Sequence, residues 1–319
     1  MTPADLSRCV VRAVRCAVED GELPAEAAVP ERVVVERTRP GGVGEYATPV
    51  AFHVAKAARR APRDVARVLA DRLGGEPGIE NVEITGAGFL NFVLAPRSAA
   101  EVVEDVLQRG AVEVEPFCWV PTVGPRERAV REAVRRIEAS QGARGTGGSP
   151  QPLKIAPVAR RDGDVVARYG ADAALWAMLS VPARETPVFS DELLVQGESS
   201  EFFRVRYAHA RSRALSRNAA DLGFGPEAGD VSDAPQLIRA LADHPLVLEA
   251  AAHHRAPERL VRHLVEPADA LLDFQYRVLP KGDEKPSAAH RARLALAEAA
   301  GTVLAGGLAL LGIDAPERL

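Results

Sequence analysis

The sequence predicts an α+β N-terminal domain followed by a mostly α-helical bundle, with a short remnant α/β linker region between them. Residues 1–97 mix helical periodicity with β-branched runs, which is the pattern of a small mixed fold. Residues 98–164 contain the stretch QGARGTGGSPQP, whose glycine, serine and proline content is typical of a flexible loop. Residues 165–319 place apolar residues at helical spacing nearly throughout, which favours an antiparallel bundle.

The N-terminal domain is predicted to begin with a helix over 4–20, where apolar residues recur at intervals of three and four. The run ERVVVER at 31–37 predicts a strand, and the glycines of 41–44 predict a loop after it. Thr48 is expected to cap a second helix, with Pro49 in the first helical position.

A third helix and two strands complete this domain. The third helix is expected over 62–73, where apolar residues again recur on one side. Residues 82–85 and 88–94 alternate apolar and polar side chains, so they predict two strands of a hairpin. Together these elements make a compact α+β domain of about one hundred residues.

The linker region is predicted to mix short strands, a helix and a loop. Residues 112–120 and 153–159 predict the strands, residues 125–140 an arginine- and glutamate-rich helix, and residues 141–152 the loop. In the bundle, we expect helices over 165–180, 190–197, 201–221, 233–242, 244–253, 257–275 and 287–311.

The overall charge limits the classes of partner. The chain has 319 residues, a net charge of −4 and 47% hydrophobic residues, so it is not a generally basic nucleic-acid coat. We expect no DNA partner, and any polyanion must be held by a local, salt-sensitive patch. No stretch approaches the ~20 apolar residues of a membrane span, and no signal-peptide pattern occurs, so no membrane partner is expected.

The cysteines and histidines argue against a metal site. Cys9, Cys16 and Cys118 include no CxxC pair, which disfavours a disulfide framework or a zinc site and fits a reducing cytoplasm. The adjacent His253 and His254 would point to different sides of a helix. We therefore expect a cytoplasmic protein without a bound metal.

One segment, FFRVRYAHARSRAL at 202–215, concentrates basic and aromatic residues, and no acidic residue occurs between Glu201 and Asp221. Guanidinium groups suit phosphates, and tyrosine or histidine can stack on unpaired bases. The alternative is a solvated, salt-bridged helix face, which the lack of a carboxylate on the same helix disfavours. The candidate residues are Arg204, Arg206, Tyr207, His209, Arg211, Arg213 and Arg217.

The motif YAHAR at 207–211, with its lead-in SSEFFRVR, resembles the helix that opens the DALR anticodon-binding domain of arginyl-tRNA synthetases. Residues 169–180 (YGADAALWAMLS) and 187–193 (PVFSDEL) are similar to the segment that joins the catalytic domain of those enzymes to this bundle. Residues 277–319 resemble their C-terminal helices.

The N-terminal domain resembles the additional N-terminal domain of the same enzymes. The similarity lies in EYATPVAFHVAK at 45–56, APRDVARVLADRL at 61–73 and IENVEITGAGFLNFVL at 79–94. The resemblance thus implies three parts: an N-terminal-like α+β domain, a remnant in place of the catalytic domain, and a DALR-type helical bundle. Their expected bounds are 1–97, 98–164 and 165–319.

The catalytic signatures of that family are missing from the sequence. A class I synthetase requires a His-x-Gly-His motif and a Lys-Met-Ser-Lys-Ser-type loop to stabilise the transferring phosphate, and neither occurs here. In the region 120–142, which is a candidate relic of the signature, Arg126 and Arg128 stand where histidines would be required. We expect no enzymatic activity and no cofactor.

The resemblance also implies contact residues. Those of the bundle are the basic and aromatic residues named above, and those of the N-terminal domain are Gly44, Tyr46, Phe89 and Asn91, near the tRNA D-loop. For Phe89 and its neighbour Phe92 the alternative is core packing, and for Asn91 it is a turn hydrogen bond.

The sequence departs from the family pattern at several positions. Arg206 replaces a common glutamine, Pro49 replaces an asparagine, and Leu319 replaces a frequent methionine. The aromatic residues Phe274 and Tyr276 are out of the usual register. Because the last two changes fall where the family reads anticodon bases, we expect contacts to RNA shape and backbone to be better preserved than base reading.

These observations predict a non-catalytic paralogue that holds tRNA, with arginine tRNA as the expected partner, through D-loop and anticodon-arm contacts. The alternative is a protein-interaction or regulatory module that pairs with a genuine arginyl-tRNA synthetase or with itself. A third hypothesis, an enzyme for another tRNA-dependent reaction, finds no nucleophile–base pair or phosphate-cradling loop in the sequence.

Overall fold

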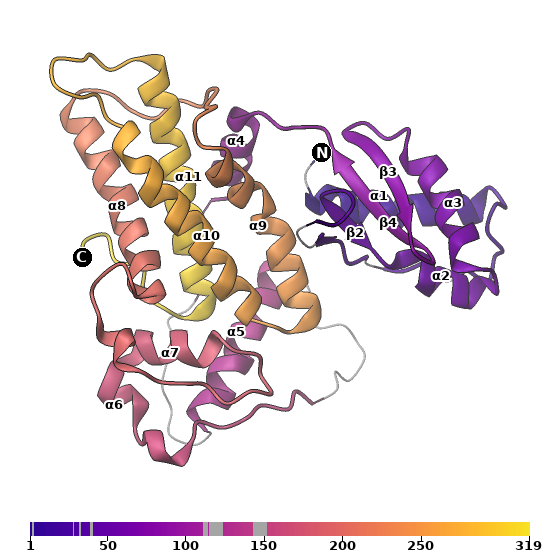
Figure 1. The fold of residues 1–319 in the computed structure, drawn as a ribbon, viewed down its shortest axis with the longest axis horizontal. Helices are drawn as coiled ribbons and strands as arrows, with labels where there is room; N and C mark the ends of the chain where they lie inside the picture. The colour runs from indigo at the N-terminus through magenta and orange to yellow at the C-terminus, as the bar shows by residue number, and fades with distance from the viewer. Residues whose placement is uncertain are drawn as a thin grey trace. The chain divides into compact units, whose positions relative to one another are not determined.

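The computed structural model divides the chain into two compact units, Met1–Arg97 and Ser98–Leu319 (Figure 1). The second unit includes the described part of 98–164, which the sequence assigns to a separate linker region. The predicted strand at 112–120 and the predicted loop at 141–152 fall largely outside the described residues. The structure describes residues 1, 3–27, 29–31, 33–38, 41–110, 114, 124–142 and 152–319.

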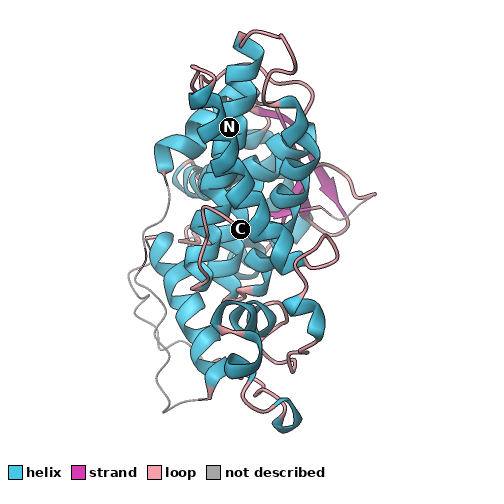
Figure 2. Ribbon diagram, turned by 90° about the vertical axis from the view of Figure 1, so that its left-hand side faces the viewer, coloured by secondary structure: helices cyan, strands magenta, loops and turns pink. Residues whose placement is uncertain are grey.

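The first unit combines an antiparallel sheet with helices, as predicted, and all of the strands drawn in Figure 2 belong to it. The strand order is β1-β2-β4-β3, so β4 pairs with both β2 and β3. Only the last two residues of the predicted strand 31–37 pair, and β2 was missed because it is three residues long. The elements are α1 (Pro3–Glu19), β1 (Glu36–Arg37), β2 (Tyr46–Thr48), α2 (Val50–Ala58), α3 (Pro62–Leu73), β3 (Ile79–Thr85) and β4 (Phe89–Leu94).

The start of α2 differs by one position from the prediction. Pro49 is the N-cap residue, and its position before the first helical turn leaves no side-chain cap. The Thr48 hydroxyl instead donates to the Val34 carbonyl at 2.7 Å and accepts from the Val50 amide at 3.3 Å. Thr48 therefore ends β2 and joins the preceding segment to the first amide of α2, because its hydroxyl bonds on both sides.

The second unit is helical and has one hydrophobic core. Buried residues of α4 and α5, such as Val103 and Ile137, belong to the same core as those of the later helices. The described helices of 98–164 are thus part of this unit's packing. The described helices of the whole second unit are α4 (Ala99–Arg109), α5 (Pro125–Ser140), α6 (Val165–Tyr169), α7 (Ala171–Leu179), α8 (Glu201–Asp221), α9 (Pro235–His254), α10 (Glu258–Phe274) and α11 (Ala288–Leu311), with short 3₁₀ turns η1 (Arg160–Asp162), η2 (Asp191–Leu194) and η3 (Gln275–Arg277).

The predicted strand at 153–159 is wrong: these residues form no strand, and Ala156 is instead held by a backbone bond, from its amide to the Ala183 carbonyl at 2.8 Å, and by a side chain. The fully buried Arg126 of α5 donates to the carbonyls of Ala156 and Pro182, both at 2.9 Å, and to that of Glu185. Burial lowers the pKa of the Arg126 guanidinium. Arg126 is therefore an internal anchor for the segment between α5 and α8.

The apolar helix α11 is long and apolar enough to cross a membrane by length and composition, which the sequence reading did not anticipate. However, 78% of its most apolar window is buried inside this unit, as expected of a core helix. It packs closely on α8, since a Cβ atom at Gly301 would collide with the Ser212 side chain. The Ser212 hydroxyl donates to the Ala297 carbonyl at 2.7 Å, which fixes the contact.

Candidate nucleic-acid interface

Helix α8 carries the basic segment and is held on one side by the core. Ser200 caps it by accepting a hydrogen bond from the Phe203 amide at 3.3 Å. Val205, Ser212 and Leu215 are buried, so this side of the helix packs inward. Two flanks remain: one borders α10 and η3, and the other borders the segment 313–319.

The first flank forms a groove of about 750 Å³ beside α10 and η3, named here the aromatic groove. The rings of Phe203 and Tyr207 stack at 5.4 Å with an interplanar angle of 10°. Across the groove, Tyr276 is 67% exposed. Exposed aromatic faces of this kind are platforms on which unpaired bases stack. The groove is lined by Gly197, Glu198, Phe203, Arg204, Tyr207, Asp269, Leu272, Asp273, Gln275 and Tyr276.

Arg204 lies in this groove, but its donors are used within the protein. Its guanidinium donates to the Asp269 carboxylate at 2.7 and 3.3 Å and to the Glu198 carbonyl at 2.6 Å. The hydrogen bond to Asp269 raises the pKa of Arg204, so the pair stays ionised. Arg204 therefore joins α8 to α10, and a phosphate would have to compete with a bidentate carboxylate.

Arg211 lies about two turns after Arg204 along α8 and orients a side chain of the groove. Its Nε donates to the Gln275 side-chain oxygen, and the Gln275 amide donates to the Leu272 carbonyl at 2.9 Å. The two bonds fix the amide of Gln275 at the wall of the aromatic groove.

The second flank is covered by the segment 313–319, whose carboxylates and carbonyls meet the other predicted residues. Arg213 pairs with Glu317 at 3.2 Å, and Arg217 donates to the Glu317 carbonyl at 3.4 Å. His209 is buried, with Nδ1 2.9 Å from the Pro316 carbonyl, and burial lowers the pKa of its ring. His209 is thus neutral near pH 7 and is not available as a stacking surface in this conformation.

The salt-bridged alternative therefore holds for part of the arginine row. The carboxylates that the helix lacks between its end residues Glu201 and Asp221 come from other elements: Asp269 of α10 for Arg204, Glu317 for Arg213, and Asp172 of α7 beside Arg206. Arg213 remains about half exposed, and its ion pair with Glu317 lies at the surface. Such surface pairs contribute little free energy, so a phosphate can replace one of them readily.

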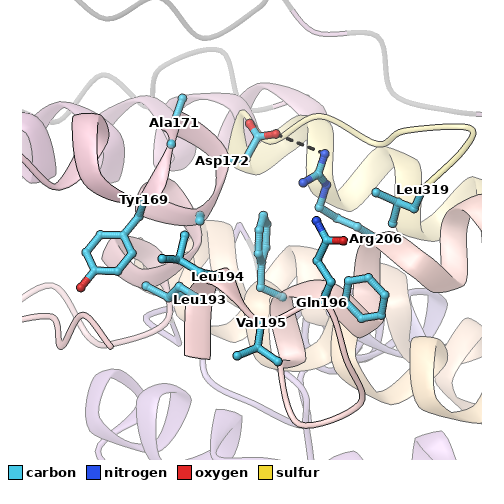
Figure 3. A pocket seen from close by; sticks show the side chains of 13 residues that line it. Tyr169, Ala171, Asp172, Leu193, Leu194, Val195, Gln196, Arg206 and Leu319 are labelled. Atoms are coloured by element: carbon cyan, nitrogen blue, oxygen red, sulfur yellow. Dashed lines mark ion pairs between the residues drawn. The ribbon is translucent and has the colours of Figure 1, made fainter. Parts of the chain in front are cut away.

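A second, smaller pocket of about 370 Å³ lies where Arg206 meets the start of α7. Figure 3 shows Asp172 and Arg206 facing one another at its edge, with Leu193, Leu194 and Val195 on the other side in that view. The Arg206 Nη2 is 3.6 Å from the Asp172 carboxylate. Burial raises the pKa of Asp172, and the Arg206 guanidinium opposes this rise.

In the first unit, two of the four predicted contact residues shape the sheet. Gly44 has φ +72°, and a Cβ there would lie 3.0 Å from the Phe92 carbonyl oxygen, so only glycine lets this loop cross β4. Asn91 is buried and its amide donates to Thr85 Oγ1 at 2.8 Å and to the Glu83 carbonyl at 3.3 Å. These bonds run across to the paired strand β3, so they differ from the turn hydrogen bond considered as the alternative for Asn91.

The other two differ in accessibility. Tyr46 is buried, and the Arg37 guanidinium lies 6.0 Å from its ring centroid. Phe89 is 44% exposed and packs its ring edge-on against Phe52 at 5.0 Å. Phe92 is fully buried, as its core alternative expected. Of the four predicted residues, Phe89 is the one whose ring a nucleotide can reach directly.

Sequence reasoning missed Asp172, Phe202 and Gln275, which complete the two pockets. Asp172 lies in the motif YGADAALWAMLS, which the sequence reading treated only as a connection. No local pattern marks Gln275, because its importance comes from a partner on another helix. Its link to Arg211 spans 64 positions of the sequence, a distance over which spacing carries no signal.

Comparison with known proteins gives matches over both units. Residues 6–94 match the family model of the arginyl tRNA synthetase N terminal domain, and residues 205–319 match that of the DALR anticodon binding domain. The chain is 25% identical to an arginine–tRNA ligase of Frankia alni in an alignment of 556 residues that spans both proteins entirely. It also matches the solved arginyl-tRNA synthetase of Thermus thermophilus, with 15% identity, a TM-score of 0.63 and full coverage of both chains, which is a likeness of fold.

Proposed function

We propose that this arginyl-tRNA synthetase-like chain, which carries the N-terminal and DALR anticodon-binding domains of that family and lacks its catalytic domain, is a non-catalytic tRNA-binding protein. The presence of a DALR domain suggests tRNA binding by itself. We propose further that the partner is arginine tRNA, held through its D-loop by the first unit and through its anticodon arm by the second. The proposed location is the cytoplasm.

The observation that carries this proposal is the aromatic groove. A stacked pair, Phe203 and Tyr207, faces an exposed ring, Tyr276, across about 750 Å³ of open space. An unpaired anticodon-loop base can enter this space and stack, while the adjoining backbone passes along α8. The exposed guanidinium of Arg213 lies on the same helix, where a phosphate can exchange with Glu317.

The non-catalytic part of the proposal is supported by chemistry. Activation of an amino acid requires groups that stabilise charge on the transferring phosphate, and the two sequence signatures that supply them are absent. Arg126, in the candidate relic of one signature, is fully buried and hydrogen-bonded to carbonyls, so it cannot reach a nucleotide in this conformation. What remains is a scaffold that can hold RNA without charging it.

The test is equilibrium binding of the full chain to arginine tRNA and to an unrelated tRNA at low salt, by fluorescence anisotropy. Replacing Tyr207 or Tyr276 by alanine should weaken binding by about 5- to 150-fold, which corresponds to about 1–3 kcal/mol per lost base stack. Val188→Ala, at an exposed apolar residue that lines neither described pocket, is the control and should leave affinity unchanged.

Each part of the proposal can be refuted by a separate result. No binding to any tRNA at low salt would refute the tRNA-binding role. Equal affinity for both tRNAs would remove the preference for arginine tRNA but leave general tRNA binding. Transfer of arginine to tRNA by the purified chain in the presence of ATP would refute the non-catalytic assignment.

A further inference from the structure

The guanidinium of Arg206 is incompletely satisfied. Among the described residues, none accepts a hydrogen bond from it, since its nearest carboxylate oxygens lie at 3.6 Å on Asp172 and 3.9 Å on Asp314. Its Nε is buried and has no partner among these residues. A guanidinium offers five N–H donors, and leaving a buried one, here Nε, without an acceptor costs free energy. The arrangement therefore favours a ligand that brings acceptor atoms to Arg206.

The pocket beside Arg206 supplies the rest of a recognition site. Its volume of about 370 Å³ is in the range of small-ligand sites, and Phe202, Leu193 and Val195 give it apolar walls. The Arg206 guanidinium lies over the Phe202 ring at 5.2 Å, which fixes the plane of that side of the pocket. Apolar walls with a few converging polar groups suit a flat aromatic ligand.

The carboxylate of Asp172 requires hydrogen-bond donors on the ligand. One of its oxygens accepts the Asp314 amide at 3.4 Å, which leaves most of the carboxylate's acceptor positions unused. Asp172 and Arg206 lie side by side without a hydrogen bond between them. The ligand must therefore present adjacent donors to Asp172 and an adjacent acceptor to Arg206.

Among the nucleobases, guanine meets this requirement best. Its N1–H and N2–H₂ groups are two neighbouring donors that suit a carboxylate, and its O6 is the neighbouring acceptor that suits an arginine. Adenine and cytosine offer one donor group on that edge, and uracil offers a single N–H between two carbonyls. We propose that the Asp172–Arg206 pocket binds a guanine base, supplied either by a free guanine nucleotide or by an unpaired guanine of an RNA.

The first experiment uses GMP with the full chain, compared with AMP, CMP and UMP, by ligand-observed saturation-transfer NMR. Because all four share the phosphate and sugar, the difference between them reports the base. GMP should bind about tenfold more tightly than the other three, the size expected for a base-specific pair of hydrogen bonds. Equal affinities, or no saturable GMP binding up to about 10 mM, would overturn the proposal.

Two variants locate the site. Asp172→Asn replaces a carboxylate oxygen, which accepts, by an amide group that can donate, so the preference for GMP should disappear. Arg206→Gln should weaken GMP binding several-fold by removing the O6 contact. Asp64→Asn, which removes the same charge from an exposed ion pair with Arg67 in the first unit, is the matched control and should keep the preference. Retention of the full preference by both pocket variants, with unchanged circular dichroism, would overturn the proposal.

A competition experiment distinguishes the two sources of guanine. If the base comes from RNA, saturating GMP should weaken tRNA binding by the wild-type chain but not by Asp172→Asn. If GMP binds selectively and tRNA affinity does not change, the ligand is a free guanine nucleotide. Only this competition experiment rests on the proposed tRNA-binding function. If the chain binds no tRNA, the nucleotide and variant experiments still decide whether the pocket binds guanine.

Discussion

Replacing Arg126 with methionine should destabilise the second unit by about 3–5 kcal/mol. The guanidinium donates to the carbonyls of Ala156, Pro182 and Glu185, and more distantly to that of Val181 at 3.5 Å. The Pro182 carbonyl would keep the Glu185 amide, which donates to it at 2.9 Å. The carbonyls of Ala156 and Glu185 would lose the Arg126 donor, and at about 1–3 kcal/mol for each acceptor left without a partner these two would cost roughly 2–6 kcal/mol. Part of this is returned, because burial of the charge is itself unfavourable and lowers the pKa of Arg126.

The assay is urea unfolding followed by the fluorescence of Trp176, which is buried in α7 within the same core. Trp119 is replaced by phenylalanine in every variant, so that the signal comes from one residue. The matched control is Arg131→Met on the same helix, an exposed arginine paired with Glu127 at 2.8 Å, which should cost under about 0.5 kcal/mol. Equal losses of unfolding free energy in the two variants would refute the role assigned to Arg126.

Three further outcomes follow from the helix α8. Gly301→Ala should lower the stability by about 1–3 kcal/mol in thermal unfolding because the added methyl meets Ser212, and Ser212→Ala in the same chain should restore part of it; no restoration would argue against the steric cause. Changing Arg213 and Arg217 together to glutamine should make the salt dependence of tRNA binding shallower by about 1–2 in log–log slope, and an unchanged slope would mean that neither contacts phosphate. Burial lowers the pKa of His209, so the unfolded chain binds the proton more tightly than the folded chain does. The free energy of unfolding is therefore highest above about pH 6.5, and it decreases as the pH falls towards the pKa that His209 has in the folded chain. Urea unfolding at pH 7 and 5 should therefore show a smaller pH effect in His209→Gln than in the wild type, and identical effects would contradict this assignment.

Local periodicity predicted the helices well, because the apolar spacing of a helix is written within the helix itself. The predicted ranges 62–73, 125–140 and 201–221 coincide with α3, α5 and α8. Four elements differ from the prediction. The predicted helix 165–180 breaks at Gly170 into α6 and α7, the predicted helix 190–197 contains only the 3₁₀ turn η2, and α4 was not predicted. Helix α9, which the sequence divides in two, is continuous through Pro245. Buried residues on both sides of that proline hold the helix together despite the hydrogen bond that proline removes.

The candidate interface was predictable only in part. Sequence spacing placed the arginines on one helix but could not supply their partners, since Asp269 lies 65 positions from Arg204 and Glu317 lies 104 positions from Arg213. The absence of carboxylates seen in the sequence therefore holds only for the part of α8 between Glu201 and Asp221. The strand predicted at 153–159 does not form: the Ala156 carbonyl accepts from the Arg126 side chain, and the Ala156 amide donates to the Ala183 carbonyl.

The cover that segment 313–319 gives to α8 has a consequence for the nascent chain. Arg213 leaves the ribosome about a hundred residues before Glu317, as their separation of 104 positions requires. At translation rates of about 5–20 residues per second, this flank of the helix stays uncovered for roughly 5–20 seconds. During that interval Arg213 and Arg217 lie beside ribosomal RNA without their contacts to Glu317, which form only after the segment 313–319 has been made.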